Sequence, residues 1–315
     1  MSGPLHDDSA VLAQHIREGR FQRSLSLVAA LAGALSGLEV TYEHYRGSYN
    51  QQIMYTPVLL SLGLTAAGVS GAVSRRAART VLPAASALTV IDGAIGFYFH
   101  VRGVARKPGG WRVPVMNTIM GPPVFAPLLF SLSGYLGLIA SQLRREESPV
   151  LDLVPGIGPG GHPLLSLLPR RVSKEGIVLE QHVREGRFQK HLAAVAGVSA
   201  LLSSAEALYS HYQNNFSCRA LQGSPLVLGP LLTVAGLGTI WSKRVSRTLL
   251  PLASALALLD GTVGFIVHAR GVMRRPGGLK LPIYNIMYGP PIFAPLLFAA
   301  GGFMGLLASL LRRAD

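Results

Sequence analysis

Residues 100 to 117 read HVRGVARKPGGWRVPVMN, and residues 268 to 285 repeat them as HARGVMRRPGGLKLPIYN. Two further pairs have an offset of 167 or 168 residues: QHIREGRFQ (14–22) with QHVREGRFQ (181–189), and GPPVFAPLLF (121–130) with GPPIFAPLLF (289–298). Motifs that recur in one order along a whole chain indicate that one structural unit occurs twice. We therefore predict an internal duplication.

The residues between these motifs are strongly apolar. Of the 315 residues, 49% are hydrophobic and 14% are charged, whereas soluble domains have roughly 25% charged residues. Apolar blocks of about 20 residues are long enough to cross a hydrocarbon layer of about 30 Å as helices. Eight blocks are predicted to do so: 24–43, 54–73, 81–100, 121–142, 191–212, 225–242, 249–268 and 289–311.

The predicted fold class is all-α, a polytopic integral membrane protein with eight transmembrane helices in two parallel four-helix repeats. The repeats are parallel because four spans return the chain to the side on which it entered. The first repeat and its N-terminal interfacial segment occupy 1–143, a Pro/Gly-rich cytoplasmic linker 144–180, and the second repeat 181–315. Both fourth helices open with Gly-Pro-Pro, and Pro127 is predicted to kink the first of them.

The charged residues indicate an orientation. The chain has 29 Lys and Arg against 15 Asp and Glu, and most of these cations fall on the side of the predicted membrane where both termini lie. The positive-inside rule then places both termini in the cytoplasm, in a cell inner membrane. Because the cations are spread over loops between spans, nucleic acid is not an expected partner. The single cysteine, Cys218, excludes an internal disulfide.

A set of polar residues recurs inside the predicted spans. Asp92, Gly96 and His100 are spaced i, i+4, i+8, so they share one stripe of a helix. The same stripe returns as Asp260, Gly264 and His268. The glycine leaves space for a neighbouring helix or for a flat ligand. His44 and His211 end the first helix of each repeat, at the membrane level predicted for His100 and His268.

Two imidazoles on opposed helices can hold a haem iron from both sides. We therefore predict a cofactor site in each repeat, for haem b or for quinone, and no metal other than haem iron. Its residues are His44, His100, His211, His268, Gly96 and Gly264, with Arg102 and Arg270 positioned to pair with haem propionates or an acidic partner. A purely structural role of the histidines, as hydrogen-bond links between helices, stays open.

The acidic residues inside the predicted spans are candidates for several roles. Glu39, Asp92, Glu206 and Asp260 are candidates for a proton or ion path, because ionisable groups at membrane depth are costly unless they are paired or functional. They are equally able to link helices by hydrogen bonds. The segments QHIREGRFQ and QHVREGRFQ are interpreted as interfacial anchors to anionic lipid.

These patterns favour a membrane-embedded subunit of a respiratory or dehydrogenase-type complex. It would anchor a peripheral partner and pass electrons toward quinone through haem b, with the bilayer and further protein subunits as its partners. No residue of the chain itself is predicted to be catalytic, so at most it is the quinone-reducing subunit of an oxidoreductase. The alternatives are an ion- or proton-coupled transporter or channel, and a membrane scaffold without a cofactor.

Overall fold

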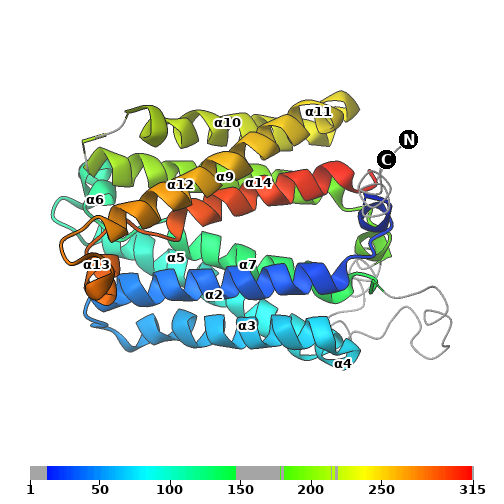
Figure 1. Ribbon diagram of the computed structural model, residues 1–315, viewed down its shortest axis with the longest axis horizontal. Helices are drawn as coiled ribbons and strands as arrows, with labels where there is room; N and C mark the ends of the chain where they lie inside the picture. Colours follow the sequence, from blue (N-terminus) through cyan, green and yellow to red (C-terminus); the bar gives the residue numbers. More distant parts are fainter. Residues whose placement is uncertain (1–12, 147–177, 179–180, 214, 217–218, 314–315) are drawn as a thin grey trace.

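The computed structural model describes residues 13–146, 178, 181–213, 215–216 and 219–313, and all regular structure within these ranges is helical. The long helices lie side by side along the longest axis of the molecule (Figure 1). The described chain begins and ends at the same end of this bundle. The greater part of the predicted linker, 147–177 and 179–180, lies outside the described residues.

The two halves of the chain have the same order of long helices. The first half contains α2 (Gln22–Arg46), α3 (Thr56–Val73), α5 (Val81–Ala105) and α7 (Ala126–Gln142). The second half contains α9 (Gln189–Gln213), α10 (Arg219–Trp241), α12 (Leu249–Met273) and α14 (Ala294–Leu310). Short elements join them: η1 (Gln52–Tyr55), α4 (Arg75–Arg79), η2 (Gly110–Arg112), α6 (Pro114–Ile119), α11 (Lys243–Arg247), η4 (Gly278–Lys280) and α13 (Pro282–Met287).

The lengths and apolar character of these helices define a multi-pass membrane protein. Six segments of the described chain are long and apolar enough to cross a membrane: Gln22–Arg46, Gln52–Val73, Arg75–Ala105, Gln189–Gln213, Leu221–Trp241 and Leu249–Met273. Large apolar side chains point outward from them, as with Leu59 and Leu62, which are 66% and 65% exposed. Such a surface is stable against lipid and unfavourable in water.

The fourth helix of each half begins later than predicted. α7 starts at Ala126 and α14 at Ala294, and both are 17 residues long. The Gly-Pro-Pro segments precede the helices instead of opening them. Pro127 therefore stands in the first turn, where its missing N–H would have no helical partner. The predicted kink at Pro127 is wrong for this reason.

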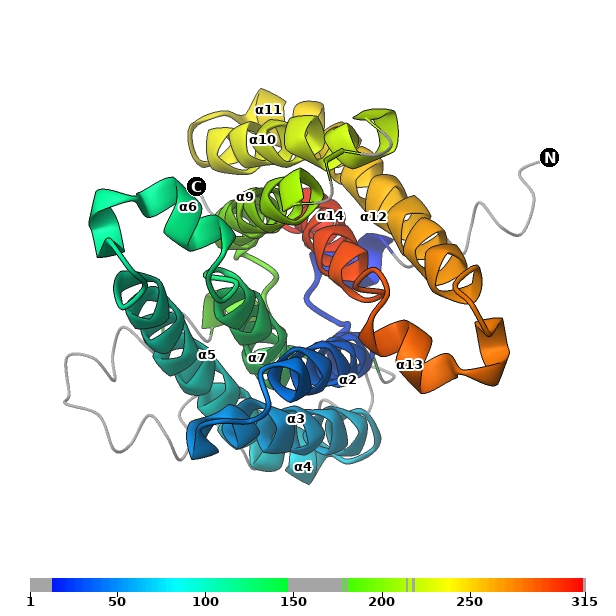
Figure 2. The same cartoon turned by 90° about the vertical axis from the view of Figure 1, so that its left-hand side faces the viewer.

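Each half is a ring of four helices. In the first half α2 and α5 each pack against both α3 and α7, so α2 and α5 lie diagonally across the bundle, and α9 and α12 take the same positions in the second half (Figure 2). Glycines permit the close approaches. A Cβ added to Gly68 of α3 would lie 2.6 Å from the carbonyl oxygen of Ser26 in α2.

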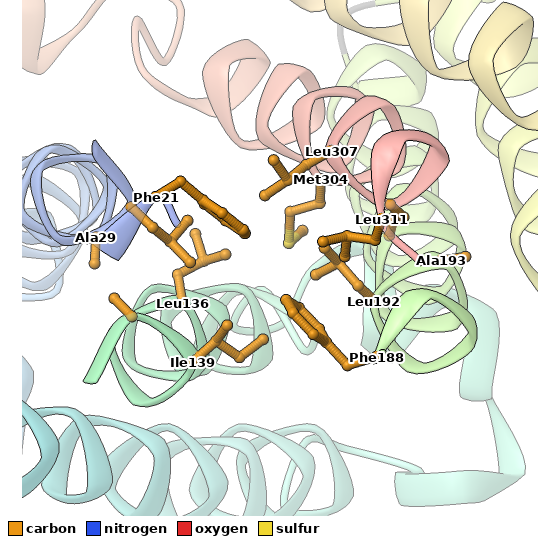
Figure 3. Packing of buried hydrophobic residues seen from close by; sticks show 14 of the residues in the cluster. Phe21, Ala29, Leu136, Ile139, Phe188, Leu192, Ala193, Met304, Leu307 and Leu311 are labelled. Atoms are coloured by element: carbon orange, nitrogen blue, oxygen red, sulfur yellow. The ribbon is translucent and has the colours of Figure 1, made fainter. Parts of the chain in front are cut away.

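An apolar cluster joins the two halves at the end where the described chain begins and ends. Phe21, Leu136 and Ile139 of the first half meet Phe188 and Met304 of the second (Figure 3). All five side chains are buried. The burial of large side chains from both halves in one cluster stabilises the contact between the halves.

The segments QHIREGRFQ and QHVREGRFQ touch each other at this end. Gly19 and Gly186 have φ angles of +73° and +71°, which L-residues with a side chain rarely adopt. A Cβ on Gly19 would lie 2.5 Å from the Arg184 carbonyl oxygen, and one on Gly186 would lie 2.6 Å from that of Arg17. The two segments thus pack backbone against backbone, and this contact explains why glycine occupies the same position in both motifs.

Candidate histidine site

The four predicted histidines lie at the end of the bundle opposite the apolar cluster, near the carboxyl ends of α2, α5, α9 and α12. Every one of them hydrogen-bonds through Nδ1 to a backbone carbonyl oxygen, which lies just before the next long helix for His44, His100 and His268 and in the first turns of α10 for His211. The distances are 2.7 Å from His44 to Met54, 2.6 Å from His100 to Pro123, 3.0 Å from His211 to Gln222, and 2.6 Å from His268 to Pro291.

These hydrogen bonds determine which nitrogen carries the proton. A carbonyl oxygen only accepts, so Nδ1–H must donate in all four side chains. In a neutral imidazole the Nε2 atom is then left with its lone pair. Histidines that ligate metals usually have this arrangement, in which a backbone carbonyl orients the ring and makes it a better ligand.

The structure brings His211 and His268 together. Their ring centroids are 6.4 Å apart and the ring planes are inclined by 74°. Two imidazoles bound to one iron at about 2 Å, each with its ring centre about 1.2 Å behind the ligating nitrogen, would have centroids roughly 6 to 6.5 Å apart. In the first half, His44 and His100 lie within electrostatic range of each other.

Asp92 and Asp260 each have a hydroxyl partner that the sequence interpretation missed. Thr56 at the start of α3 donates from Oγ1 to Asp92 Oδ1 at 2.6 Å, and Ser224 of α10 is a hydrogen-bond partner of Asp260. Thr56 and Ser224 are 168 residues apart, and a proline follows both of them. The sequences of α3 and α10 differ so much that they hide the correspondence of Thr56 and Ser224. A hydroxyl residue followed by proline, at the 168-residue offset of the other motifs, is a signal that could have revealed it.

The space above the stripe glycines is filled by the fourth helices. A Cβ on Gly96 would lie 3.0 Å from Pro127 Cβ, and a Cβ on Gly264 would lie 3.0 Å from Pro295 Cβ. Of the two occupants expected for this space, the structure contains the neighbouring helix. Gly96 and Gly264 therefore set the distance between α5 and α7, and between α12 and α14.

Glu39 and Glu206 lie between the halves, away from the aspartates. Glu206 of α9 accepts the backbone N–H of Phe125 at 2.6 Å and also that of Ala126, at the start of α7. Glu39 of α2 accepts the backbone N–H of Phe293, at the start of α14. No side chain of α7 or α14 caps its own first turn. Each carboxyl thus caps a helix of the opposite half, a favourable position for negative charge.

Arg102 and Arg270 are exposed one turn or less beyond His100 and His268. The loops that follow α5 and α12 have the same backbone conformation and the same hydrogen bonds at equivalent positions. Gly109 and Gly277 have φ angles of +80° and +84°. The amide nitrogen of Asn117 donates to the Gly110 carbonyl oxygen at 2.8 Å, and that of Asn285 donates to the Gly278 carbonyl oxygen at 2.9 Å. Both loops are ordered by their own hydrogen bonds.

Within the described residues no group of three or more His, Cys, Asp or Glu side chains is arranged to hold a metal ion. A pair of imidazoles fits a cofactor that supplies the remaining ligands itself, as a porphyrin does. No family model, no curated protein and no solved structure matches the chain.

Proposed function

We propose that the chain is an eight-span membrane protein of two parallel four-helix repeats, and that the paired histidines of each repeat ligate one haem b. It would serve as the membrane subunit of a respiratory or dehydrogenase-type complex, anchor a peripheral partner, and pass electrons toward quinone. The charge distribution favours a cell inner membrane with both termini in the cytoplasm.

One observation carries the proposal. His211 and His268 come from diagonal helices, their rings are 6.4 Å apart, and both have Nδ1 held by a carbonyl oxygen. This spacing suits two Nε2 atoms on one iron, and the Nδ1 bonds hold each ring in one tautomer before any cofactor arrives. His44 and His100 have the same Nδ1 bonds in the first half.

The other residues of the site support the same role. Bound haem b would supply one-electron redox chemistry. Arg102 and Arg270 are exposed at the histidine end, where guanidinium groups would pair with carboxylates of a cofactor. Both histidine pairs lie at one end of the bundle, so electrons would be exchanged on one side of the membrane.

The test is a reduced-minus-oxidised absorbance spectrum of the full-length protein, purified from cells supplied with a haem precursor. A haem b signal is expected, and the double variant His211→Ala/His268→Ala should lose about half of it. His191→Ala is the matched control, because His191 is exposed and has no counterpart in the first half. Absence of the signal from the unaltered protein would overturn the haem proposal.

A cofactor-free scaffold is the second candidate, and the internal hydrogen bonds favour it. The histidines, Asp92 and Glu206 all have partners within the chain. In that case the histidine variants would lower stability without any spectroscopic change. The transporter alternative predicts ion-dependent flux in liposomes that Asp92→Asn abolishes, and flux in a haem-free sample would replace the electron-transfer proposal with it.

A further inference from the structure

Two grooves with corresponding lining residues open on the histidine end of the bundle, and each lies between an element of the first half and an element of the second. The larger, of about 1350 Å³, lies between the α6 region of the first half and the end of α9. The smaller, of about 820 Å³, lies between the α13 region of the second half and the end of α2. Figure 2 shows α6 beside α9 and α13 beside α2.

The groove walls are apolar and exposed. Val115 and Met116 of α6 are 70% and 59% exposed, and Ile283 of α13 is 76% exposed. The opposite wall of each groove includes an exposed tyrosine, Tyr212 in the larger and Tyr45 in the smaller. Tyrosines at the ends of membrane helices mark the level of lipid headgroups, so both grooves open where headgroups meet acyl chains.

The described lining of each groove includes a cation at the same position. Arg112 lines the larger groove and Lys280, 168 residues later, lines the smaller. Among the described residues that line the two grooves there is no Asp or Glu. The surrounding segments, 101–121 and 269–289, each contain four Lys or Arg and no acidic residue. This charge lies on the side where the positive-inside bias does not explain it.

We propose that each groove binds one anionic phospholipid, with its phosphate on Arg112 or Lys280 and its acyl chains along the apolar wall. Basic sites between membrane helices bind such headgroups. Small-molecule pockets have volumes of roughly 300–1,000 Å³. The larger groove exceeds this range and the smaller lies in its upper part, so both volumes suit a lipid with two or more chains. The proposal is independent of haem, because no histidine of the candidate site lines either groove.

The experiment uses the full chain in nanodiscs of phosphatidylcholine with a small fraction of phosphatidylglycerol, followed by mass-spectrometric counting of the lipids that stay bound in mild detergent. About two phosphatidylglycerol molecules per chain are expected. Arg112→Gln/Lys280→Gln should reduce this number at least fivefold. The control Arg106→Gln/Arg274→Gln removes two exposed cations of the same face that line neither groove, and it should retain both lipids.

Three outcomes would overturn the proposal: equal retention of phosphatidylcholine, equal loss in the control variant, or quinone in place of phospholipid. A second pair of variants tests the apolar wall. Val115→Asn and Ile283→Asn keep the cations but make the wall polar, so they should weaken the retention of phosphatidylglycerol. Glycerol phosphate, which has no acyl chains, should bind neither the unaltered protein nor these variants. Lipid retention unchanged by these substitutions would place the lipid elsewhere on the charged face.

Discussion

Glu206 of α9 accepts the Phe125 backbone N–H at 2.6 Å, so a side chain of the second half completes the first turn of α7 in the first half. We expect Glu206→Ala to lower the free energy of unfolding by about 0.5–2 kcal/mol, the usual cost of removing a helix cap. Glu206→Gln keeps an acceptor oxygen and should lose less. Denaturant unfolding in detergent measures both, and equal losses would show that the hydrogen bond contributes little.

Substitutions of two glycines by alanine should act in opposite directions. Gly19→Ala should destabilise the protein by at least about 1–2 kcal/mol, because its φ is +73° and the new Cβ would meet the Arg184 carbonyl. A Cβ added to Gly63 of α3 would have no atom within 4 Å beyond the neighbouring backbone of its own helix. Gly63→Ala should therefore stabilise by roughly 0.5–1 kcal/mol. Thermal unfolding of the two variants checks the pair, and a stable Gly19→Ala protein would contradict the backbone contact.

Glu18 gives a pH-dependent prediction. The side-chain amide of Gln14 donates to the Glu18 carboxylate at 3.0 Å, and this bond lowers the pKa of Glu18 below its ordinary value of 4.5. A depressed pKa stabilises the folded state above the unfolded pKa, and the stabilisation is lost as pH falls through the folded pKa. Glu18→Gln should thus have a lower Tm than the unaltered protein at pH 7, and the difference should shrink below pH 4.5. A Tm difference independent of pH would refute the assignment.

The hydroxyl of Thr56 should matter more than its methyl group. Thr56→Val removes the donor to Asp92 Oδ1 and should cost about 1–3 kcal/mol, the penalty of leaving a part-buried acceptor without a partner. Thr56→Ser retains the donor, so it should lose much less stability than Thr56→Val. Chemical denaturation of both variants separates the two effects, and equal destabilisation would show that packing at this position dominates.

The sequence predicted the class of fold well because apolar runs of membrane length are strong local signals. The starts of α7 and α14 were misplaced for a local reason as well. Hydropathy counts Pro122 and Pro123 as part of an apolar run, whereas neither is in the helix, which begins at Ala126.

Contacts between the two halves could not be predicted from the sequence. Glu39 and Glu206 were expected to link helices or to form a proton or ion path, without a named partner, because nothing local indicates that each carboxyl meets the opposite half. The hydrogen bonds at Nδ1 of His44 and His100 require the carbonyl groups of Met54 and Pro123 to lie beside these side chains. The path of the connecting segments decides this, and the spacing of residues along a helix does not predict it. Spacing along a helix predicted which polar residues share a face, and only the assembled bundle shows what they touch.

The reciprocity of the Gly19 and Gly186 contacts has an evolutionary consequence. Each half presents the same residues to the other, as Arg17 does to Gly186 and Arg184 does to Gly19. A contact of this kind is isologous, the type that identical subunits form about a twofold axis. Under the duplication that the repeated motifs predict, the ancestral unit would have carried a self-complementary surface of the kind found in homodimers. Fusion of two such units into one chain would then have allowed each half to diverge, and the two grooves, with corresponding positions but different volumes, are an example of such divergence.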